Sequence, residues 1–336
     1  MISLSDIPSH SSGRSPVQAY GPIALMALVL ATAPWWLPSV GLYQYLGIEI
    51  AIWMIFALGF NLLFGYAGLH SFGHGAYLGI GAYAFGLFQQ NVAVSLWGGL
   101  AAGILAAGLA GAIVGAFISH RRGIYYALLT IAFGQVFWFV AVKAHGITGG
   151  EDGLLRIVRL PVDLGVVVLP LEGNVALYYG VLAVFVLVSL GLWRLVHSPF
   201  GRVVKAIKQN EERARFVGYN VWAAKFAVIV LSAALSGLAG GLFAMAQRSA
   251  FPDVMSLHYS GYIVMMTLIG GGLVSFWGPV VGAVVFLLAR DLIGAFTTGW
   301  MLWFGALFVA LVMFRPDGLA GMLGAIRFPA RRGGKG

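Results

Sequence analysis

The chain contains no cysteine, so disulfide bonds, iron–sulfur clusters and thiol chemistry are excluded. Charged residues are also scarce, because Asp, Glu, Lys and Arg together make up 9% of the chain, against about 25% in soluble proteins. No G-x-x-x-x-G-K-[ST] phosphate loop occurs, so the chain cannot hold ATP by that motif. The sequence therefore lacks the groups of a redox protein and of a P-loop ATPase.

Apolar residues are abundant instead. They make up 60% of the 336 residues, and the mean hydropathy is +0.91. A water-soluble fold cannot bury that much apolar surface, whereas a bilayer accommodates helices of roughly 20 apolar residues. Glycine occurs 48 times, as expected where membrane helices approach closely or break. We predict an all-α polytopic membrane protein.

Apolar runs predict about ten transmembrane helices, some of them broken. Gly-rich stretches near 65–80 and 268–282 indicate re-entrant or broken helices. The predicted segments are residues 20–38, 43–64, 72–90, 95–118, 124–142, 174–196, 226–246, 260–274, 279–295 and 297–314.

Positive charge predicts the orientation, because cytoplasmic loops are enriched in Lys and Arg. Arg121 and Arg122 lie between the fourth and fifth segments, and the loop 197–225 carries six basic and two acidic residues, a net charge of +4. The tail 319–336 is also basic. These regions are predicted to be cytoplasmic, and ten spans then place both termini inside.

The sequence also predicts how the chain is divided into regions. Residues 1–19 are Ser-rich and polar, and we expect a flexible cytoplasmic N-terminus. Residues 20–318 form the transmembrane domain, and the long loop 143–173, with four acidic and three basic residues, lies on the outer, periplasmic face.

Few polar residues interrupt the apolar segments, and such residues are site candidates by default. Glu49 lies near the end of its span, where it can extend to the membrane surface. Asn61 and Gln135 lie deeper and need hydrogen-bond partners, which neighbouring helices commonly supply. Arg290 and Asp291 are adjacent, and successive helix residues do not face each other, so we expect them to bond to different neighbours.

The stretch "GLHSFGHGAYLGIGAY" (68–83) places His70 and His74 four residues apart. A metal site, a proton relay and a bend in the backbone are the alternatives. A metal site needs more ligands than this stretch offers, a relay needs more titratable groups, and the glycines disfavour a regular helix. "GLHSF" returns as "GLVSF" at 272–276, which suggests an internal repeat. We interpret both segments as bent backbone at membrane depth, with no metal.

The loop 197–225 predicts an amphipathic helix from Arg202 to Val217, ended by Gly218. Val203, Ile207, Ala214 and Val217 would share its apolar side. The helix could lie on anionic lipid headgroups or fit a groove in a cytoplasmic partner.

"HGITGGEDGL" (145–154) packs four glycines around two acids. It is either a tight turn in an exposed loop or a docking surface for a soluble partner.

Six motifs in order resemble one family. They are "GYAGLHSFGHGAYLGIGAY" (65–83), "YYALLTIAFGQV" (125–136), "TGGEDGL" (148–154), "EERARFVGYNVWAAKF" (211–226), "LSAALSGLAGGLFA" (231–244) and "IGGGLVSFWGPVVGA" (269–283). Together they resemble the LivM-type permease subunit of branched-chain amino-acid ABC importers. Glu211, Ala214 and Gly218 match that family's coupling loop, and His74 matches its Ser-x-Gly-His pattern.

The resemblance implies partners and a role. A second permease subunit would share the translocation pathway, two cytoplasmic ATPase subunits would bind ATP and Mg, and a periplasmic binding protein would deliver the substrate. This chain would need no cofactor, would not be an enzyme and would not bind nucleic acid. Its place would be a bacterial inner membrane.

Three groups of site residues follow as predictions. The translocation pathway would include Asn61, Gly73, His74, Tyr77 and Gln135. ATPase coupling would involve Arg202, Lys205, Glu211, Glu212, Arg213, Ala214 and Gly218. The binding protein would dock on Thr148, Gly149, Gly150, Glu151 and Asp152.

Two alternatives remain. The same machinery could carry urea or short amides, since cargo depends on a few unplaced side chains. The chain could instead be a stand-alone secondary transporter or channel, which would need intramembrane acids to bind coupling ions, and only Glu49 and Asp291 are available.

Overall fold

The computed structural model describes residues 29–39, 41–163, 168–169, 171, 173–273, 275–314 and 318–319, and these are predominantly helical. The predicted N-terminal segment 1–19 and, apart from Leu319, the basic tail 319–336 lie outside the described residues. The elements after helical residues 29–39 are α2 (Gln44–Asn61), the π-helix η2 (Leu62–Tyr66), α3 (Gly75–Asn91), α4 (Leu96–Ile118), α5 (Gly123–Lys143), α6 (His145–Thr148), the 3₁₀ turn η3 (Gly150–Asp152), β1 (Val162–Asp163), β2 (Val168–Leu169), α7 (Asn174–His197), α8 (Pro199–Gln209), α9 (Glu211–Phe216), α10 (Val221–Gln247), η4 (Pro252–Met255), α11 (Leu257–Gly270), α12 (Gly278–Phe296) and α13 (Trp300–Phe314).

Each of the ten predicted segments overlaps a helix. Within the described residues, six helices are long and apolar enough to cross a membrane: α2 continued by η2, α4, α5, α7, α10 and α12. The chain is therefore a helical, multi-pass membrane protein, as predicted. Helices α3, α11 and α13 are shorter, with 17, 14 and 15 residues, so the number of ten crossings stays a prediction.

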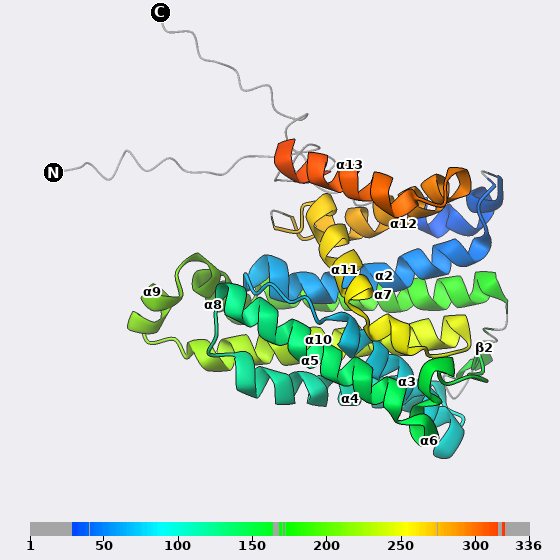
Figure 1. Ribbon diagram of the computed structural model, residues 1–336, viewed down its shortest axis with the longest axis horizontal. Helices are drawn as coiled ribbons and strands as arrows, with labels where there is room; N and C mark the ends of the chain where they lie inside the picture. The colour runs from blue at the N-terminus through cyan, green and yellow to red at the C-terminus, as the bar shows by residue number, and fades with distance from the viewer. Residues whose placement is uncertain are drawn as a thin grey trace, which may run out of the picture.

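The long helices lie side by side along the long axis of the molecule (Figure 1). Helices α8 and α9 lie at one end of this axis, and α6 with the small antiparallel β1–β2 hairpin lies at the other. Helix α2 is the centre of the fold, because α7, α10, α11 and α12 all pack against it. Residues 46–61 of this helix are all buried.

Glycine backbones bring three helices together. Gly81 of α3, Gly103 of α4 and Gly237 of α10 meet where a methyl group on any one would overlap or crowd the backbone of another. A methyl group on Gly240 would likewise overlap the Leu78 carbonyl. Lipid tails are as apolar as the helices, so association in a membrane depends on such close van der Waals contact rather than on the hydrophobic effect.

An ion-pair cluster connects α2 and α12. The guanidinium of Arg290 donates to both carboxylate oxygens of buried Glu49, at 2.8 and 2.9 Å, so Glu49 is paired inside the protein. Arg290 and Asp291 bond to different neighbours, as predicted, namely Glu49 and Tyr43. They also bond to each other, which was not expected, because Arg290 Nε donates to Asp291 Oδ1 at 2.9 Å. The guanidinium has five N–H donors, and three of its hydrogen bonds serve the two acids. Asp291 also accepts from the Tyr43 hydroxyl at 2.8 Å.

We predict that Gly237→Ala destabilises the protein by about 1–3 kcal/mol, the usual cost of overpacking a well-filled core. The new methyl group must push α10 away from α4, because it would lie on the Gly103 carbonyl. Thermal unfolding in detergent measures the effect.

The control is Gly191→Ala in α7, where no neighbouring atom lies within 4 Å of the added carbon. This control should unfold at or above the wild-type temperature, since alanine favours helix. Equal behaviour of the two variants would show that the glycine contact does not hold these helices together.

Candidate functional site

The first break in the membrane helices lies between η2 and α3. The chain leaves helical geometry at Ala67 and resumes it at Gly75. Backbone polar groups at membrane depth need partners within the protein. Thr130 of α5 accepts from the Phe72 N–H at 3.1 Å, and Ser260 of α11 accepts from the Gly75 N–H at 2.9 Å. The predicted bend is confirmed, and hydroxyl groups of neighbouring helices accept hydrogen bonds from its free N–H groups.

His74 is fully buried beside this break. Its Nε2 lies 2.9 Å from Ser232 Oγ, and the Ser232 hydroxyl donates to the Gly59 carbonyl at 2.7 Å. Because that hydroxyl has one proton, His74 Nε2 is the donor to Ser232. The imidazole also packs against the rings of Phe56, Phe60 and Tyr77. His74 therefore connects α2, α3 and α10.

His70 has different surroundings from His74. It is exposed, and its ring packs edge-on against Phe64 with ring centroids 4.9 Å apart. The two histidines thus have separate partners on an irregular backbone, so their spacing of four residues does not bring them to one helical face. The described residues contain no group of three or more His, Asp and Glu that could hold a metal ion.

The predicted pathway residues divide into two sets. Asn61, Gly73, His74 and Tyr77 are all buried at the first break or beside it. Gly73 is required there, because a methyl group would overlap the Thr130 carbonyl of α5. Gln135 lies apart from them, on the exposed face of α5 among Leu128, Val136, Phe139 and Val140. Their roles in transport stay predictions.

Asn61 marks the place where the two breaks meet. A side chain on Gly65 would overlap Asn61 Oδ1 and one on Gly272 would lie 2.7 Å from it, so both backbones press on this amide. The expected interhelical hydrogen bond is absent, because neither amide atom of buried Asn61 has a partner in the described part of the chain. The second break, between α11 and α12, begins at Gly271 with φ +82°. Val274, which replaces His70 in the suggested repeat, lies outside the described residues.

The coupling loop, residues 197–225, forms two helices where one was predicted. Asn210 has extended backbone (φ −159°, ψ 104°), and its side chain accepts from the Arg213 N–H at 2.9 Å, so it ends α8 and caps α9. Gly218 ends α9 with φ +99°, as its position predicted. The sequence signal that was missed is an asparagine directly before Glu211 and Glu212, the usual start of a helix.

The apolar side of the coupling loop also differs in part from the predicted one. Ile207 and Ala214 pack with Val221 and Ala224 of α10, and Val203 lies against this cluster. Val217 was expected on the same side but is 70% exposed, and Phe216 is 90% exposed. The end of α9 therefore presents an apolar tip that none of the described residues covers.

A charge cluster holds α9 to the membrane domain. Glu211 accepts from Arg122 Nε at 2.8 Å and lies 3.3 Å from the Nζ of Lys225, whose side chain is 1% exposed. Lys225 also donates to the Arg121 carbonyl at 2.9 Å. Sequence reasoning missed both partners of Glu211. Arg122 comes from a distant segment, and Lys225 lies 14 residues further along the chain, on α10. The adjacent Glu212 is 74% exposed.

Lys208 connects α8 to the first break. Its Nζ donates to the Gly65 carbonyl at 2.6 Å, and its side-chain stem lies along Gly68. Partial burial lowers the pKa of Lys208 below its ordinary value. A cavity of about 200 Å³ adjoins it, lined also by Arg122, Glu211 and Lys225. The sequence offered no signal for this contact, since Lys208 is one of six basic residues in its loop.

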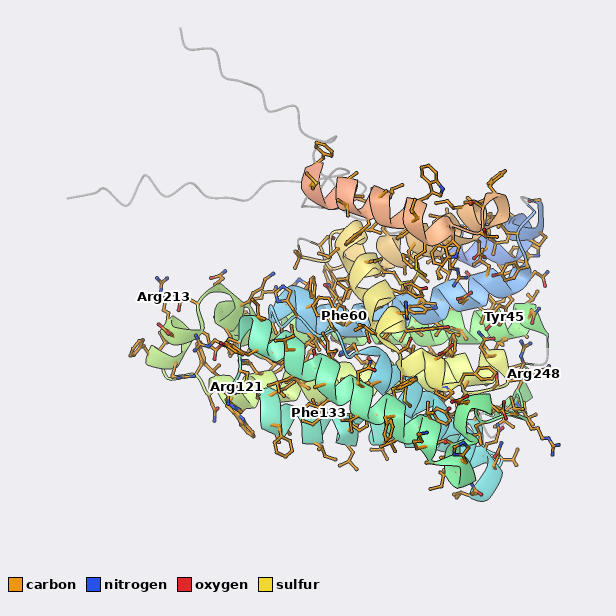
Figure 2. All side chains as sticks on the ribbon, viewed as in Figure 1. Tyr45, Phe60, Arg121, Phe133, Arg213 and Arg248 are labelled. Carbon is orange, nitrogen blue, oxygen red and sulfur yellow. The ribbon has the colours of Figure 1, made fainter. Side chains whose placement is uncertain are left out.

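The other predicted coupling residues lie on the same end. Arg202 and Arg213 are exposed, and Figure 2 shows Arg213 at the far end of the molecule with Arg121, opposite Arg248 and Tyr45. Lys205 places its Nζ 5.2 Å from the centre of the Tyr66 ring. Two lysines of α8 therefore contact η2.

The stretch 145–154 is a compact turn. Gly149, Gly150 and Gly153 all have positive φ, between 65° and 78°, and a side chain on any of them would collide with neighbouring atoms. The Thr148 hydroxyl lies 2.6 Å from the Ala141 carbonyl and 2.9 Å from the Ala144 carbonyl, and these two acceptors share its single proton. Glu151 and Asp152 are exposed on this turn. The tight turn is confirmed, and docking there stays a prediction.

We predict that Glu211→Gln loosens the coupling loop, because it leaves Lys225 without a counter-charge in a buried position. Limited proteolysis of the purified protein should cut residues 210–220 several-fold faster than in wild type. The matched control is Glu212→Gln, since an exposed ion pair contributes little. Equal cleavage rates in the two variants would contradict the role given to Glu211.

Comparison with known proteins gives one consistent family. The family described as "Branched-chain amino acid transport system / permease component" matches residues 43–315. The high-affinity branched-chain amino acid transport system permease protein LivM of Salmonella typhimurium is 29% identical over 322 residues, covering 89% of this chain and 74% of that protein. The LivM protein of Escherichia coli is 28% identical over 290 residues, covering 81% and 68%.

A third relative is similar along most of its length. The probable LivM permease protein of Methanocaldococcus jannaschii is 22% identical over 330 residues, covering 84% of this chain and 94% of that protein. The family match includes both breaks, the coupling loop and the Gly-rich turn. This chain belongs to the family of permease components of branched-chain amino acid transport systems.

Proposed function

We propose that this chain is a permease subunit of an ATP-driven importer for branched-chain and other hydrophobic amino acids. Such a permease needs an energy source on a partner, since the sequence has no P-loop. The observation that carries the proposal is the uncovered apolar tip of α9, Phe216 and Val217, at the basic end of a permease-family chain. Exposed apolar groups rimmed by charge are typical of protein–protein contacts. ATPase subunits carrying ATP and Mg are the expected partners.

The proposed topology has ten crossings with both termini in the cytoplasm of a bacterial inner membrane. Supporting it, α8–α9 and α6 lie at opposite ends of the molecule, and the basic residues of the coupling loop gather at one of them (Figures 1 and 2). The turn with Glu151 and Asp152 then faces the periplasm. A binding protein with basic groups on its lobes could dock on these two acids.

A second permease subunit is expected against α5. Gln135 is exposed there in the middle of an apolar helix, and an unpaired amide in hydrocarbon is costly. A protein partner that bonds to Gln135 removes this cost, whereas lipid does not. The same face would then border the translocation pathway between the two subunits.

The two alternative functions would require different features of the structure. Carriage of urea or short amides would keep every contact above and change only the cargo. A stand-alone secondary transporter would use Glu49 or Asp291 for coupling ions, but Arg290 already pairs with both acids. This pairing disfavours the second alternative.

We predict that Phe216→Asp prevents recovery of the ATPase subunits with the permease in affinity purification, because it puts a charge into an apolar contact. The control is Val94→Asp, at an exposed apolar residue (72%) outside the coupling loop. If the ATPase still co-purifies with Phe216→Asp, the α9 tip is not the docking surface.

Uptake into proteoliposomes tests the function itself. With the second permease, ATPase subunits and binding protein present, leucine, isoleucine or valine should accumulate only when ATP is supplied. Accumulation without ATPase subunits would support the stand-alone transporter. Uptake of urea but not of leucine would move the proposal to short amides.

A further inference from the structure

The coupling loop and the first break touch directly at Lys208. The Nζ–Gly65 carbonyl distance of 2.6 Å describes a short, charge-assisted hydrogen bond, a class about twice as strong as neutral ones. Lys205 adds a second contact, on the ring of Tyr66. Any displacement of α8 therefore acts on η2 without an intervening element.

Gly65 is the residue where such a bond matters. It lies in the last turn before the chain leaves helical geometry, and the final carbonyls of a helix lack N–H partners within it. Lys208 supplies a donor from outside the helix. A bond of this kind helps to fix where the helix ends, so its loss changes the relative stability of different positions for the break.

Asn61 supplies an independent observation on the other side of the same residue. Its side chain presses on Gly65 and Gly272, is buried to 1% exposure, and has neither amide atom hydrogen-bonded within the described residues. A buried amide without partners is costly, and native proteins retain few of them. A shift of the break that brings a backbone N–H or C=O group to this amide would therefore be favourable.

We propose that Lys208 is a positioning residue through which the coupling loop sets the arrangement of residues 62–74. Here its ammonium holds the Gly65 carbonyl and Asn61 stays unpaired. When α8 moves away, Gly65 loses this donor, the break shifts, and the Asn61 amide bonds to the freed backbone. The inference rests on the proposed function, because an ATPase partner is needed to move α8.

The absence of native cysteine makes a direct test possible. His70→Cys places one thiol at an exposed position inside the break. In the assembled complex, its rate of alkylation should differ several-fold between the nucleotide-free and ATP-bound states. Adding Lys208→Met should abolish this difference and lower leucine uptake per ATP hydrolysed about tenfold, while ATP hydrolysis continues.

Two variants separate a specific role from general damage. Lys208→Arg keeps a charged donor and should restore part of the nucleotide dependence, whereas Gln209→Met, at the neighbouring exposed residue, should behave as wild type. If Lys208→Met does not assemble, Asn61→Leu provides the second test. It removes the group that gains partners, so alkylation at position 70 should stay at its nucleotide-free rate when ATP is added.

The outcomes are distinct. Wild-type uptake per ATP and nucleotide-dependent alkylation in Lys208→Met would overturn the inference, and so would unchanged nucleotide dependence in Asn61→Leu. Failure of the unmodified complex to take up amino acids would instead overturn the proposed function.

Discussion

The contact of α10 with α3 and α4 is the constraint on which the rest of the structure depends. Within it, Gly81, Gly103 and Gly237 let backbones approach so closely that no side chain fits between them. Helix α10 is held in place by this contact, and it then positions two other regions. Ser232 bonds to His74 at the first break, and Lys225 bonds to Glu211 in the coupling loop.

Helix α10 thus fixes the distance between the first break and the coupling loop. Ser232 and Lys225 lie on the same continuous helix, two turns apart, so the distance between their partners is set by helical geometry. The coupling loop adds its own contact through Lys208. The break between α2 and α3 is therefore bonded to α10 through Ser232 and to the coupling loop through Lys208. Helix α10 is held by its close contacts with α3 and α4, whereas the coupling loop lies at the surface.

Hydrophobicity and glycine predicted most of the fold. The ten apolar segments overlap helices, and both Gly-rich stretches are breaks, because apolar length and helix-breaking residues act locally. The Arg290 cluster was not predictable in the same way, since the pairing of Glu49 with Arg290 depends on how α2 meets α12. Asn210 was a local signal that was overlooked; its capping side chain divides the coupling loop into two helices.

The site was predicted in part. His74 and Gly73 were singled out from their glycine-rich surroundings, and both lie at the break, although His74 bonds to a serine that the sequence did not mark. Thr130, Ser232 and Ser260 were missed because isolated hydroxyl residues are common in apolar helices. Only the tertiary structure shows that they are the groups that satisfy the bent backbone or hold His74 beside it.

The junction of α7 and α8 has a mechanical consequence. Only Ser198 separates the two helices, and its side chain accepts from the Gly201 N–H. A side chain on Gly201 would overlap the Val196 carbonyl, so the corner is filled by backbone on both sides. A junction of one residue, packed on both sides by backbone, leaves little freedom for α7 and α8 to change their relative angle. A push on α9 that reaches α8 therefore acts on α7, which packs along α2, through a single connecting residue.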